Sequence, residues 1–203
     1  MDSDKYLTIA EPSEGIYKEK GSRFLSFAYP VFSADEIKQL IAQVEKKYHD
    51  ARHCCYAWKL GLGDDNFRQN DDGEPSGTAG RPIYGQILSN NLTNVLVIVV
   101  RYFGGIKLGT GGLIVAYKTA TADALANAKI VEQYVCDTYE VNFSYDAMND
   151  VMKVLKDSTV EVLSQQFDLN CKCTIRMRQA ETDKILKRLY DIKSVEPTFI
   201  SSI

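Results

Sequence analysis

The segment from residue 95 to residue 117 constrains the fold of this chain more than any other. It reads VLVIVVRYFGGIKLGTGGLIVAY, an apolar run of six residues, then five glycines within nine residues, then a helical pattern. We expect a strand over 95–100 and a helix over about 110–128. A strand that ends in glycines before a helix leaves backbone N–H groups unpaired at the positive end of the helix dipole. The segment is therefore the first place to look for an anion site or a close backbone contact.

The glycine segment does not match the standard phosphate-binding loops. Gly104 and Gly109 have the outer spacing of a G-x-x-x-x-G-K-[ST] loop, but Thr110 stands in the lysine position. The dinucleotide motif G-x-G-x-x-G also fails, because Gly109 and Gly111 are followed by Ile114 at its last position. We expect a weak anion site without hydrolysis. The residues expected to form it are Gly104, Gly105, Gly109, Thr110, Gly111 and Gly112.

Composition and charge are those of a globular protein and argue against a basic nucleic-acid-binding module. The chain has 203 residues, 45% of them hydrophobic and 25% charged, with a net charge of -3. Residues up to 136 include 15 basic and 16 acidic side chains, and the remainder includes 9 and 11. Non-specific binding to nucleic acid depends on concentrated Lys and Arg, so it is disfavoured.

Targeting signals and cysteine usage predict a cytoplasmic protein with no membrane partner. The first residues contain no basic region followed by an apolar run, and no stretch approaches the length that spans a bilayer. The five cysteines include the adjacent pair Cys54 and Cys55, while Cys171 and Cys173 fall on one side of a strand. Neither pair has C-x-x-C spacing, so we expect reduced, buried thiols.

The first part of the chain reads as an alternation of strands and helices. Ser33 and Glu36 have capping-box spacing, and the apolar pattern after them predicts a helix over about 34–47. A strand should follow, with Cys54, Tyr56, Trp58 and Leu60 on one face and His53, Cys55 and Lys59 on the other. We expect 61–78 to be a long polar loop without an element of its own. A short helix should begin near 76–78 and end near Gln86, with Thr78 as its capping hydroxyl.

The pattern changes near residues 134–138, which predicts two domains, 1–136 and 137–203. The second domain should contain strands near 139–145, 159–167, 171–178 and 194–200. Helices should fall at about 148–155 and after Thr182, which we expect to cap the second of them. The order βαββαβ is the ferredoxin-like arrangement, so we expect an α+β protein.

Three motifs resemble those of the YigZ/IMPACT family. They are RHCCYAW at 52–58, DDGEPSGTAGRPI at 71–83 and RYFGGIKLGTGGL at 101–113, and the resemblance extends over nearly the whole chain. Cys54 replaces the asparagine that is usual in the family after the histidine. The resemblance implies a first domain with the left-handed βαβ fold of a ribosomal small-subunit protein domain, elongation factor G and GHMP kinases. It also implies a second domain similar to the ferredoxin-like C-terminal domain of elongation factor G.

The same resemblance implies a regulator or accessory factor of translation. Eukaryotic members of the family act through protein contacts that restrain a stress-activated initiation-factor kinase, whereas bacterial members have no settled activity. The resemblance therefore specifies the fold more closely than the function.

The loop at 71–82 offers a metal-binding interpretation and a structural one. Asp71, Asp72 and Glu74 place three carboxylates within four residues and could hold Mg²⁺ beside a bound phosphate. The same residues also suit a solvated turn with a left-handed position, which we favour. We expect no metal, no cofactor and an internal ion pair from Arg81 to an Asp or Glu.

Other candidate residues lie on two strands. His53 and Cys55 share a strand face, but neighbours on one face are about 6–7 Å apart, too far for the bond that activates a thiolate. We therefore expect no catalytic residue. In the second domain, Lys172, Thr174, Arg176 and Arg178 share the polar face of a strand. This face could contact RNA, dock on the first domain or serve solubility.

The leading hypothesis is a non-enzymatic binding protein of the translation or stress-response system, with a protein or ribosome-associated partner. The alternatives are a nucleotide- or phosphate-handling enzyme that uses 104–112, and an RNA-binding module. The expected binding surface comprises Asp71, Asp72, Glu74, Arg81, Arg101, Tyr102 and Lys107.

Overall fold

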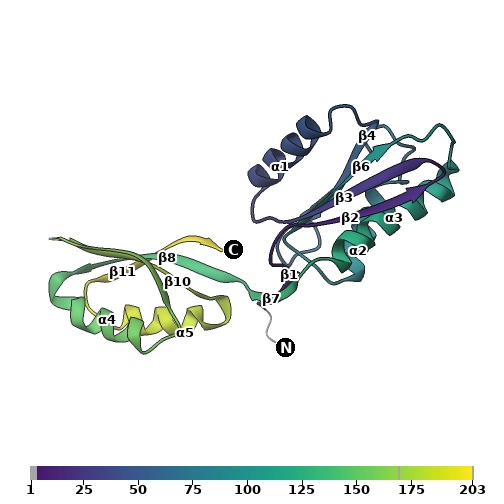
Figure 1. Ribbon diagram of the computed structural model, residues 1–203. Coiled ribbons are helices and arrows are strands. Elements are labelled where there is room, and N and C mark those ends of the chain that lie inside the picture. Colours follow the sequence, from purple (N-terminus) through teal and green to yellow (C-terminus); the bar gives the residue numbers. More distant parts are fainter. Residues whose placement is uncertain (1–3, 169, 203) are drawn as a thin grey trace. The chain divides into compact units, whose positions relative to one another are not determined.

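The computed structural model describes residues 4–168 and 170–202, which form two compact units. Residues 6–132 form the N-terminal unit, and residues 4–5 together with 133–202 form the C-terminal unit (Figure 1). The division lies a few residues before the predicted position of 136, and the chain's first described residues belong with its last part. Strands β1 (Lys5–Ile9) and β7 (Ile130–Tyr134) pair in a separate two-stranded ribbon.

The N-terminal unit is a five-stranded sheet with the order β2-β3-β6-β4-β5. The strands are β2 (Ser13–Glu19), β3 (Ser22–Pro30), β4 (His53–Lys59), β5 (Phe67–Asn70) and β6 (Val95–Tyr102). Strands β3 and β4 both pair antiparallel with β6, which lies between them. The three helices are α1 (Ala34–Lys47), α2 (Gly80–Ser89) and α3 (Gly109–Ala126).

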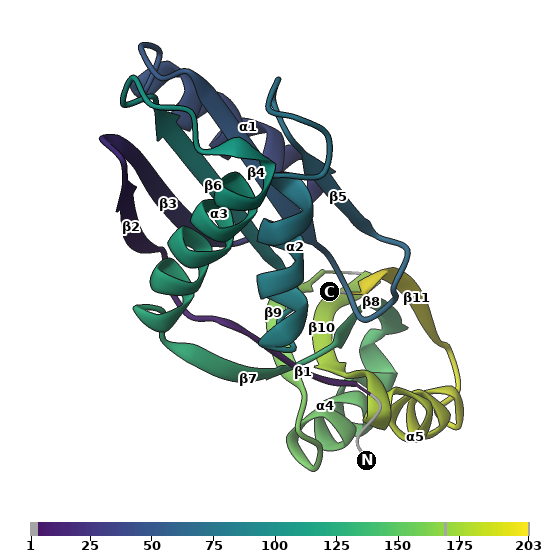
Figure 2. The same ribbon diagram turned by 90° about the vertical axis from the view of Figure 1, so that its right-hand side faces the viewer.

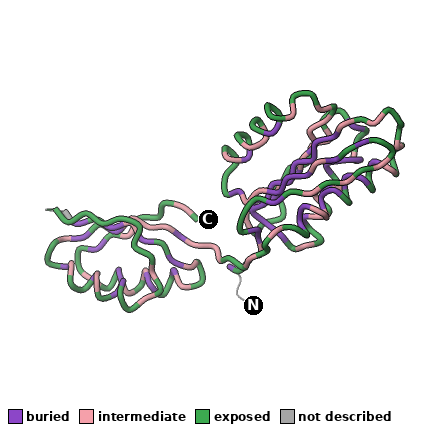
Figure 3. Tube along the Cα trace, in the orientation of Figure 1, coloured by how far each residue is buried: buried purple, intermediate pink, exposed green. Residues whose placement is uncertain are grey.

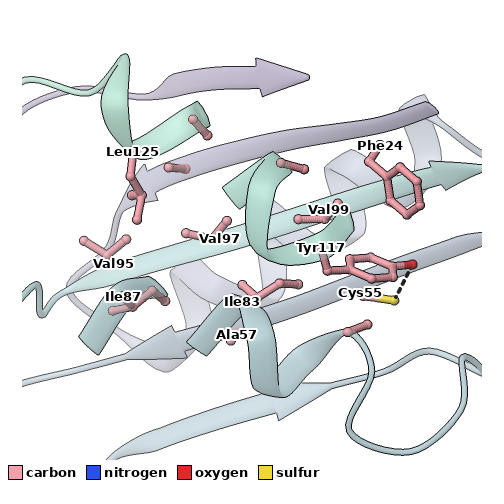
Figure 4. Packing of buried hydrophobic residues seen from close by; sticks show 14 of the residues in the cluster. Phe24, Cys55, Ala57, Ile83, Ile87, Val95, Val97, Val99, Tyr117 and Leu125 are labelled. Atoms are coloured by element: carbon pink, nitrogen blue, oxygen red, sulfur yellow. Dashed lines mark hydrogen bonds between the residues drawn. The ribbon is translucent and has the colours of Figure 1, made fainter. Parts of the chain in front are cut away.

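Helices cover both faces of this sheet (Figures 1 and 2). Val95, Val97 and Val99 of β6 belong to the core formed with α2 and α3, as Figure 4 shows. The alternate residues Leu96 and Ile98 belong to the core formed with α1. The continuous apolar run in the sequence follows from this arrangement, because a central strand covered on both faces needs apolar side chains on each.

Local sequence signals predicted most of these elements. The predicted helix at 34–47 is confirmed, and Ser33 Oγ accepts a hydrogen bond from the Glu36 N–H at 3.2 Å. The two predicted faces of β4 are confirmed as well, since Cys55 and Ala57 face one core and Cys54 faces the other.

Two predictions about the segment 61–80 are wrong. The segment contains the edge strand β5, where Phe67 stacks on Tyr84 with ring centroids 4.4 Å apart. Thr78 does not cap α2, because its hydroxyl donates to the Pro75 carbonyl oxygen at 2.6 Å. The cap comes from Asp71, whose Oδ1 accepts hydrogen bonds from the Ala79 and Gly80 N–H groups at 2.9 and 2.8 Å. A capping carboxylate eight residues away is invisible to a local capping rule.

The C-terminal unit is a ferredoxin-like four-stranded antiparallel sheet with the order β11-β8-β10-β9. Its strands are β8 (Cys136–Ser144), β9 (Glu161–Phe167), β10 (Asn170–Arg178) and β11 (Val195–Ser202). A 3₁₀ turn η1 (Tyr145–Ala147), α4 (Met148–Lys156) and α5 (Gln179–Tyr190) complete it. Cys171, Cys173, Ile175 and Met177 are buried, as predicted. Strand β9, in contrast, is exposed along its whole length. Figure 3 shows buried and exposed stretches of the chain side by side in this unit.

Helix α5 begins three residues before the predicted cap. Thr182 lies within its first turn, and the Thr182 hydroxyl donates to Asp137 Oδ2 at 2.8 Å. The residue is therefore a buried contact between α5 and β8 and not a helix cap.

Asp4 fastens the start of the chain to the C-terminal unit. Its carboxylate is fully buried and accepts from Arg178 at 2.9 and 3.2 Å and from the Ala180 N–H at 3.1 Å. The Arg178 hydrogen bond holds the pKa of Asp4 below its usual value. The carboxylate therefore stabilises the unit at neutral pH, and this contribution is lost as pH falls through the lowered pKa.

Candidate functional site

A pocket of about 600 Å³ opens in the N-terminal unit where β4 begins, β6 ends and α3 starts. It is lined by Arg52, His53, Glu74, Pro75, Arg101, Phe103, Lys107, Leu108, Gly109, Thr110 and Leu113. His53 and Arg101 are direct partners in the antiparallel pairing of β4 with β6, which brings two distant motifs to one place. The third motif supplies Glu74 from the loop between β5 and α2.

Glu74 is the buried centre of the pocket floor. Only 3% of its side chain is exposed, and Oε1 accepts from Arg101 Nη1 at 2.5 Å and from the Tyr117 hydroxyl at 2.8 Å. His53 Nε2 lies 3.8 Å from the same oxygen. A buried carboxylate costs a large desolvation free energy unless donors surround it, so this arrangement fixes the positions of all three neighbours.

Cys55 extends this network beneath the loop. Its Sγ lies 3.0 Å from the Asp71 carbonyl oxygen and 3.3 Å from the Tyr117 hydroxyl (Figure 4). Burial raises the pKa of the Cys55 thiol and of Tyr117, and it raises the pKa of Cys54 to about 12. The thiols are thus protonated at neutral pH. Since His53 Nδ1 is 2.7 Å from the Asp72 carbonyl oxygen, the imidazole is engaged away from the thiol, and the geometry gives no support to a Cys–His nucleophile.

The carboxylates of the 71–80 loop hold the loop together. Asp71 accepts from three backbone N–H groups, those of Gly77, Ala79 and Gly80, at 2.8 to 2.9 Å. Asp72 Oδ2 accepts from the Cys54 N–H at 2.6 Å, and its φ of 41° places Asp72 in the left-handed region. With Glu74 facing Arg101, the three carboxylates have different partners. Among the described residues no group of three or more His, Cys, Asp or Glu side chains is arranged to hold a metal ion.

Two further residues of the predicted surface lie outside the pocket lining. Arg81 is exposed, and within 4–168 and 170–202 it makes no ion pair, so the predicted internal pair is not formed. The pair is instead made by Arg101, which also lies over the rings of Phe24 and Phe103 at 5.5 and 5.6 Å. Tyr102 donates to Asp50 Oδ1 at 2.7 Å on the other side of the strand.

The glycines serve different purposes. Gly104 permits close packing, because a Cβ there would lie 1.9 Å from the Gly21 carbonyl carbon, and its N–H donates to Ser22 Oγ at 3.1 Å. Gly105 and Gly109 have φ values of 88° and 72°, where other residues are strained. Gly111 has open space where a Cβ would lie and no left-handed φ, so nothing in its geometry excludes a side chain.

Of the six residues predicted for the anion site, Gly109 and Thr110 line the pocket. Within the described residues, the N–H groups of Gly109, Thr110 and Gly111 have no hydrogen-bond acceptor. The start of α3 also lacks a side-chain cap. The Gly104 N–H is used by Ser22 and is unavailable to a ligand, because a strand-to-loop contact takes it.

Large apolar side chains are exposed beside the pocket. Phe103, Ile106, Ile114 and Val115 are 49%, 55%, 42% and 54% exposed and fall within thirteen residues at the end of β6 and the start of α3. We call these four residues the apolar rim. Clustered exposed apolar residues of this kind mark contact surfaces on soluble proteins.

The face of the C-terminal sheet that its helices leave uncovered carries polar side chains, and some of them pair with each other across neighbouring strands. Lys172 Nζ lies 2.5 Å from Glu140 Oε2, and Ser164 donates to Thr174 at 3.0 Å. The alternate positions of β10 that face outward carry no aromatic residue on which a base could stack. The face therefore lacks the aromatic platform of ferredoxin-like RNA-binding domains.

Sequence reasoning missed Tyr117 and the burial of Glu74. Tyr117 stands two helical turns after the glycines with the apolar periodicity of a core residue, so nothing local marks its hydroxyl as a partner for Glu74. No local signal marks this pair, because Tyr117 lies on α3 and Glu74 lies in the loop between β5 and α2, and only the packing of the two brings them together.

The fold and the pocket define a two-domain α+β protein with a pocket built from three sequence motifs. Residues 20–125 match the Impact N-terminal domain. The chain is 30% identical over 202 residues to IMPACT family member YvyE of Bacillus subtilis, covering 96% of this chain and 93% of the relative. It is 28% identical over 190 residues to IMPACT family member YigZ of Escherichia coli, covering 93% of each. The chain belongs to the IMPACT family.

One solved structure is similar to this chain over nearly its whole length. A crystal structure described as that of a hypothetical protein matches with a TM-score of 0.75 and 27% identity over 98% of each chain. No helix in the described part of the chain has the length and apolar character to cross a membrane.

Proposed function

We propose that this protein is a non-enzymatic regulatory factor of the translation or stress-response system that acts by binding a macromolecular partner. The translation setting rests on family membership. The mode of action rests on one observation, the apolar rim beside a pocket that carries cationic side chains. Apolar residues next to Arg and Lys, with a preformed hollow between them, suit a protein or ribosomal surface better than a small substrate alone.

The alternative, a phosphate-handling enzyme, is less well supported because the residues that such an enzyme requires are absent or already engaged. A phosphate-handling enzyme would need a lysine within the glycine loop and carboxylates free to hold a metal ion. Thr110 stands in the lysine position, and Asp71, Asp72 and Glu74 accept hydrogen bonds from the protein itself.

Sedimentation of the protein in cell lysate tests the proposal. We expect co-sedimentation with ribosomal particles or with a smaller protein complex, and ribonuclease treatment separates these two cases. Ile106→Ser should weaken the association about fivefold or more, because the side chain is 55% exposed in the apolar rim.

The matched control is Leu88→Ser, on α2 of the same unit and 44% exposed outside the rim. It should sediment like the wild type. The proposal is wrong if the protein stays at the top of the gradient in every lysate, or if both variants lose association equally.

A further inference from the structure

We propose that the pocket binds a phosphate monoester whose phosphate is carried on a flat apolar or aromatic body. The inference concerns the same surface as the proposed function and names the chemistry that its pocket recognises. A free mononucleotide and the terminal phosphate of an RNA share this chemistry, and the test below distinguishes the two sources.

The charges that line the pocket favour a doubly charged anion. Arg52, Arg101 and Lys107 contribute three positive charges, Glu74 contributes one negative charge, and His53 is the remaining titratable group. With neutral His53 the lining has an excess of two positive charges. A phosphate monoester carries about -1.5 to -2 charges at neutral pH, which matches this excess better than a single carboxylate does.

Arg101 is the side chain aimed at such a ligand. It is 6% exposed, yet among the described residues only its Nη1 has an acceptor, the Glu74 carboxylate. Nε is buried without any partner, and Nη2 has no acceptor within the described residues although Arg101 lines the pocket. A buried guanidinium that keeps most of its donors unused is unusual in a folded protein. Glu74 and the rings of Phe24 and Phe103 hold the group in place, so its orientation is set before a ligand arrives.

The first turn of α3 supplies backbone donors on another side of the same pocket. Gly109 and Thr110 line it, and their N–H groups are without acceptors among the described residues. The positive end of the α3 dipole favours an anion at this point. The left-handed φ of Gly109, 72°, gives this turn a shape that a regular helix start would not have.

The apolar residues of the pocket favour a ligand in which the phosphate is attached to an apolar or aromatic group. Pro75, Phe103, Leu108 and Leu113 line the rest of the pocket, and the volume of about 600 Å³ greatly exceeds that of a phosphate ion. Inorganic phosphate alone would leave these walls in contact with water. A ring placed against Phe103 would bury apolar surface and add to the binding free energy.

Titration of the full-length protein with phenyl phosphate, followed through backbone amide NMR signals, tests the inference. We expect the largest shifts at Gly109, Thr110 and Gly111, and a Kd about tenfold or more below that of inorganic phosphate. Adenosine monophosphate, an RNA oligonucleotide with a 5′-phosphate and the same oligonucleotide with a 5′-hydroxyl separate the two sources. A preference for the phosphorylated oligonucleotide over the mononucleotide identifies an RNA end.

Two variant pairs test the assigned contacts. Thr110→Pro removes a backbone N–H that no helix bond uses and should weaken phenyl phosphate about fivefold, whereas Thr110→Ala retains the N–H and should bind nearly normally. Lys107→Gln should weaken binding about fivefold, and Lys118→Gln, an exposed α3 cation outside the pocket, should not.

The inference fails if phenyl phosphate causes no shifts at these amides at millimolar concentration, or if it binds no better than inorganic phosphate. It also fails if the paired variants behave alike while their spectra show an intact fold. Each of these results leaves the sedimentation experiment unaffected, so a failed phosphate site and a failed partner surface are distinguishable.

Discussion

The two loops beside the pocket differ in how they use their polar groups. The 71–80 loop carries three carboxylates, and protein donors engage all of them. The 104–111 segment carries one charged side chain, Lys107, yet its backbone N–H groups at the start of α3 have no acceptors among the residues that the structure describes. The acidic side chains of this site therefore serve to hold the loop together. The glycine segment contains the backbone donors that could still bind a ligand.

Removing Glu74 should give the largest effect, because it tests whether the 71–80 loop is structural. Glu74→Ala leaves the Arg101 guanidinium buried without its carboxylate and should cost about 3–5 kcal/mol of unfolding free energy. Urea denaturation, followed by a spectroscopic signal of the N-terminal unit, measures this loss of unfolding free energy. Glu74→Gln retains an oxygen acceptor of similar shape but also removes the negative charge, so it should cost a large part of the same free energy. A Gln variant as stable as the wild type would contradict the ion-pair explanation.

Removing the Asp71 cap should have the next largest effect. Asp71→Ala deprives three N–H groups of their acceptor and should destabilise the unit by about 2–3 kcal/mol. Thr78→Ala is the control from the sequence-based prediction, and its loss should be about 1 kcal/mol or less because its hydroxyl bonds only the Pro75 carbonyl. The reverse order would restore Thr78 as the cap.

Substitutions of Gly109 and Gly111 compare two positions in the first turn of α3. Gly109→Ala should destabilise the protein by about 1 kcal/mol because its φ is 72°, while Gly111→Ala should be neutral or slightly stabilising in the open first turn of α3. Thermal melts of both variants decide this. A larger loss at Gly111 would mean that the turn at the start of α3 is different from the one described.

The last effect is absent at neutral pH and is a dependence of stability on alkaline pH. Burial raises the pKa of Cys54 from 9.0 to about 12, so the folded protein retains a proton that the unfolded chain loses. The contribution is complete below the unfolded pKa and disappears as pH rises toward 12. Cys54→Ala should flatten the fall of unfolding free energy above pH 9. An unchanged slope would show that burial beside the α1 core does not keep this thiol protonated.

Truncation after Cys136 remains a useful test of the division between the two units. The N-terminal unit has its own two apolar cores and should stay folded, since no residue of either core lies beyond 132. Circular dichroism and amide spectra of the fragment measure this. A molten fragment would place the boundary elsewhere.

The sequence determined the elements wherever a local pattern carries the information. Capping-box spacing gave α1, strict alternation gave the two faces of β4, and the order of elements in the second half predicted a ferredoxin-like sheet. The glycine segment also predicted backbone donors without partners, because a strand, glycines and a helix start imply them without any tertiary contact. That an anion binds there stays a prediction.

Tertiary structure alone decided which polar groups are used and which are not. The register of β4 on β6 sets His53 opposite Arg101, and the packing of the 71–80 loop and of α3 brings Glu74 to Arg101 and Tyr117. The same packing makes Asp71 the cap of α2. Hydrogen bonds between residues that are distant along the chain follow from packing and leave no periodic trace in a sequence. The residues themselves specified the chemistry available, and only the assembled sheet and helices determined that the carboxylates are satisfied while the donors of Arg101 and α3 are not.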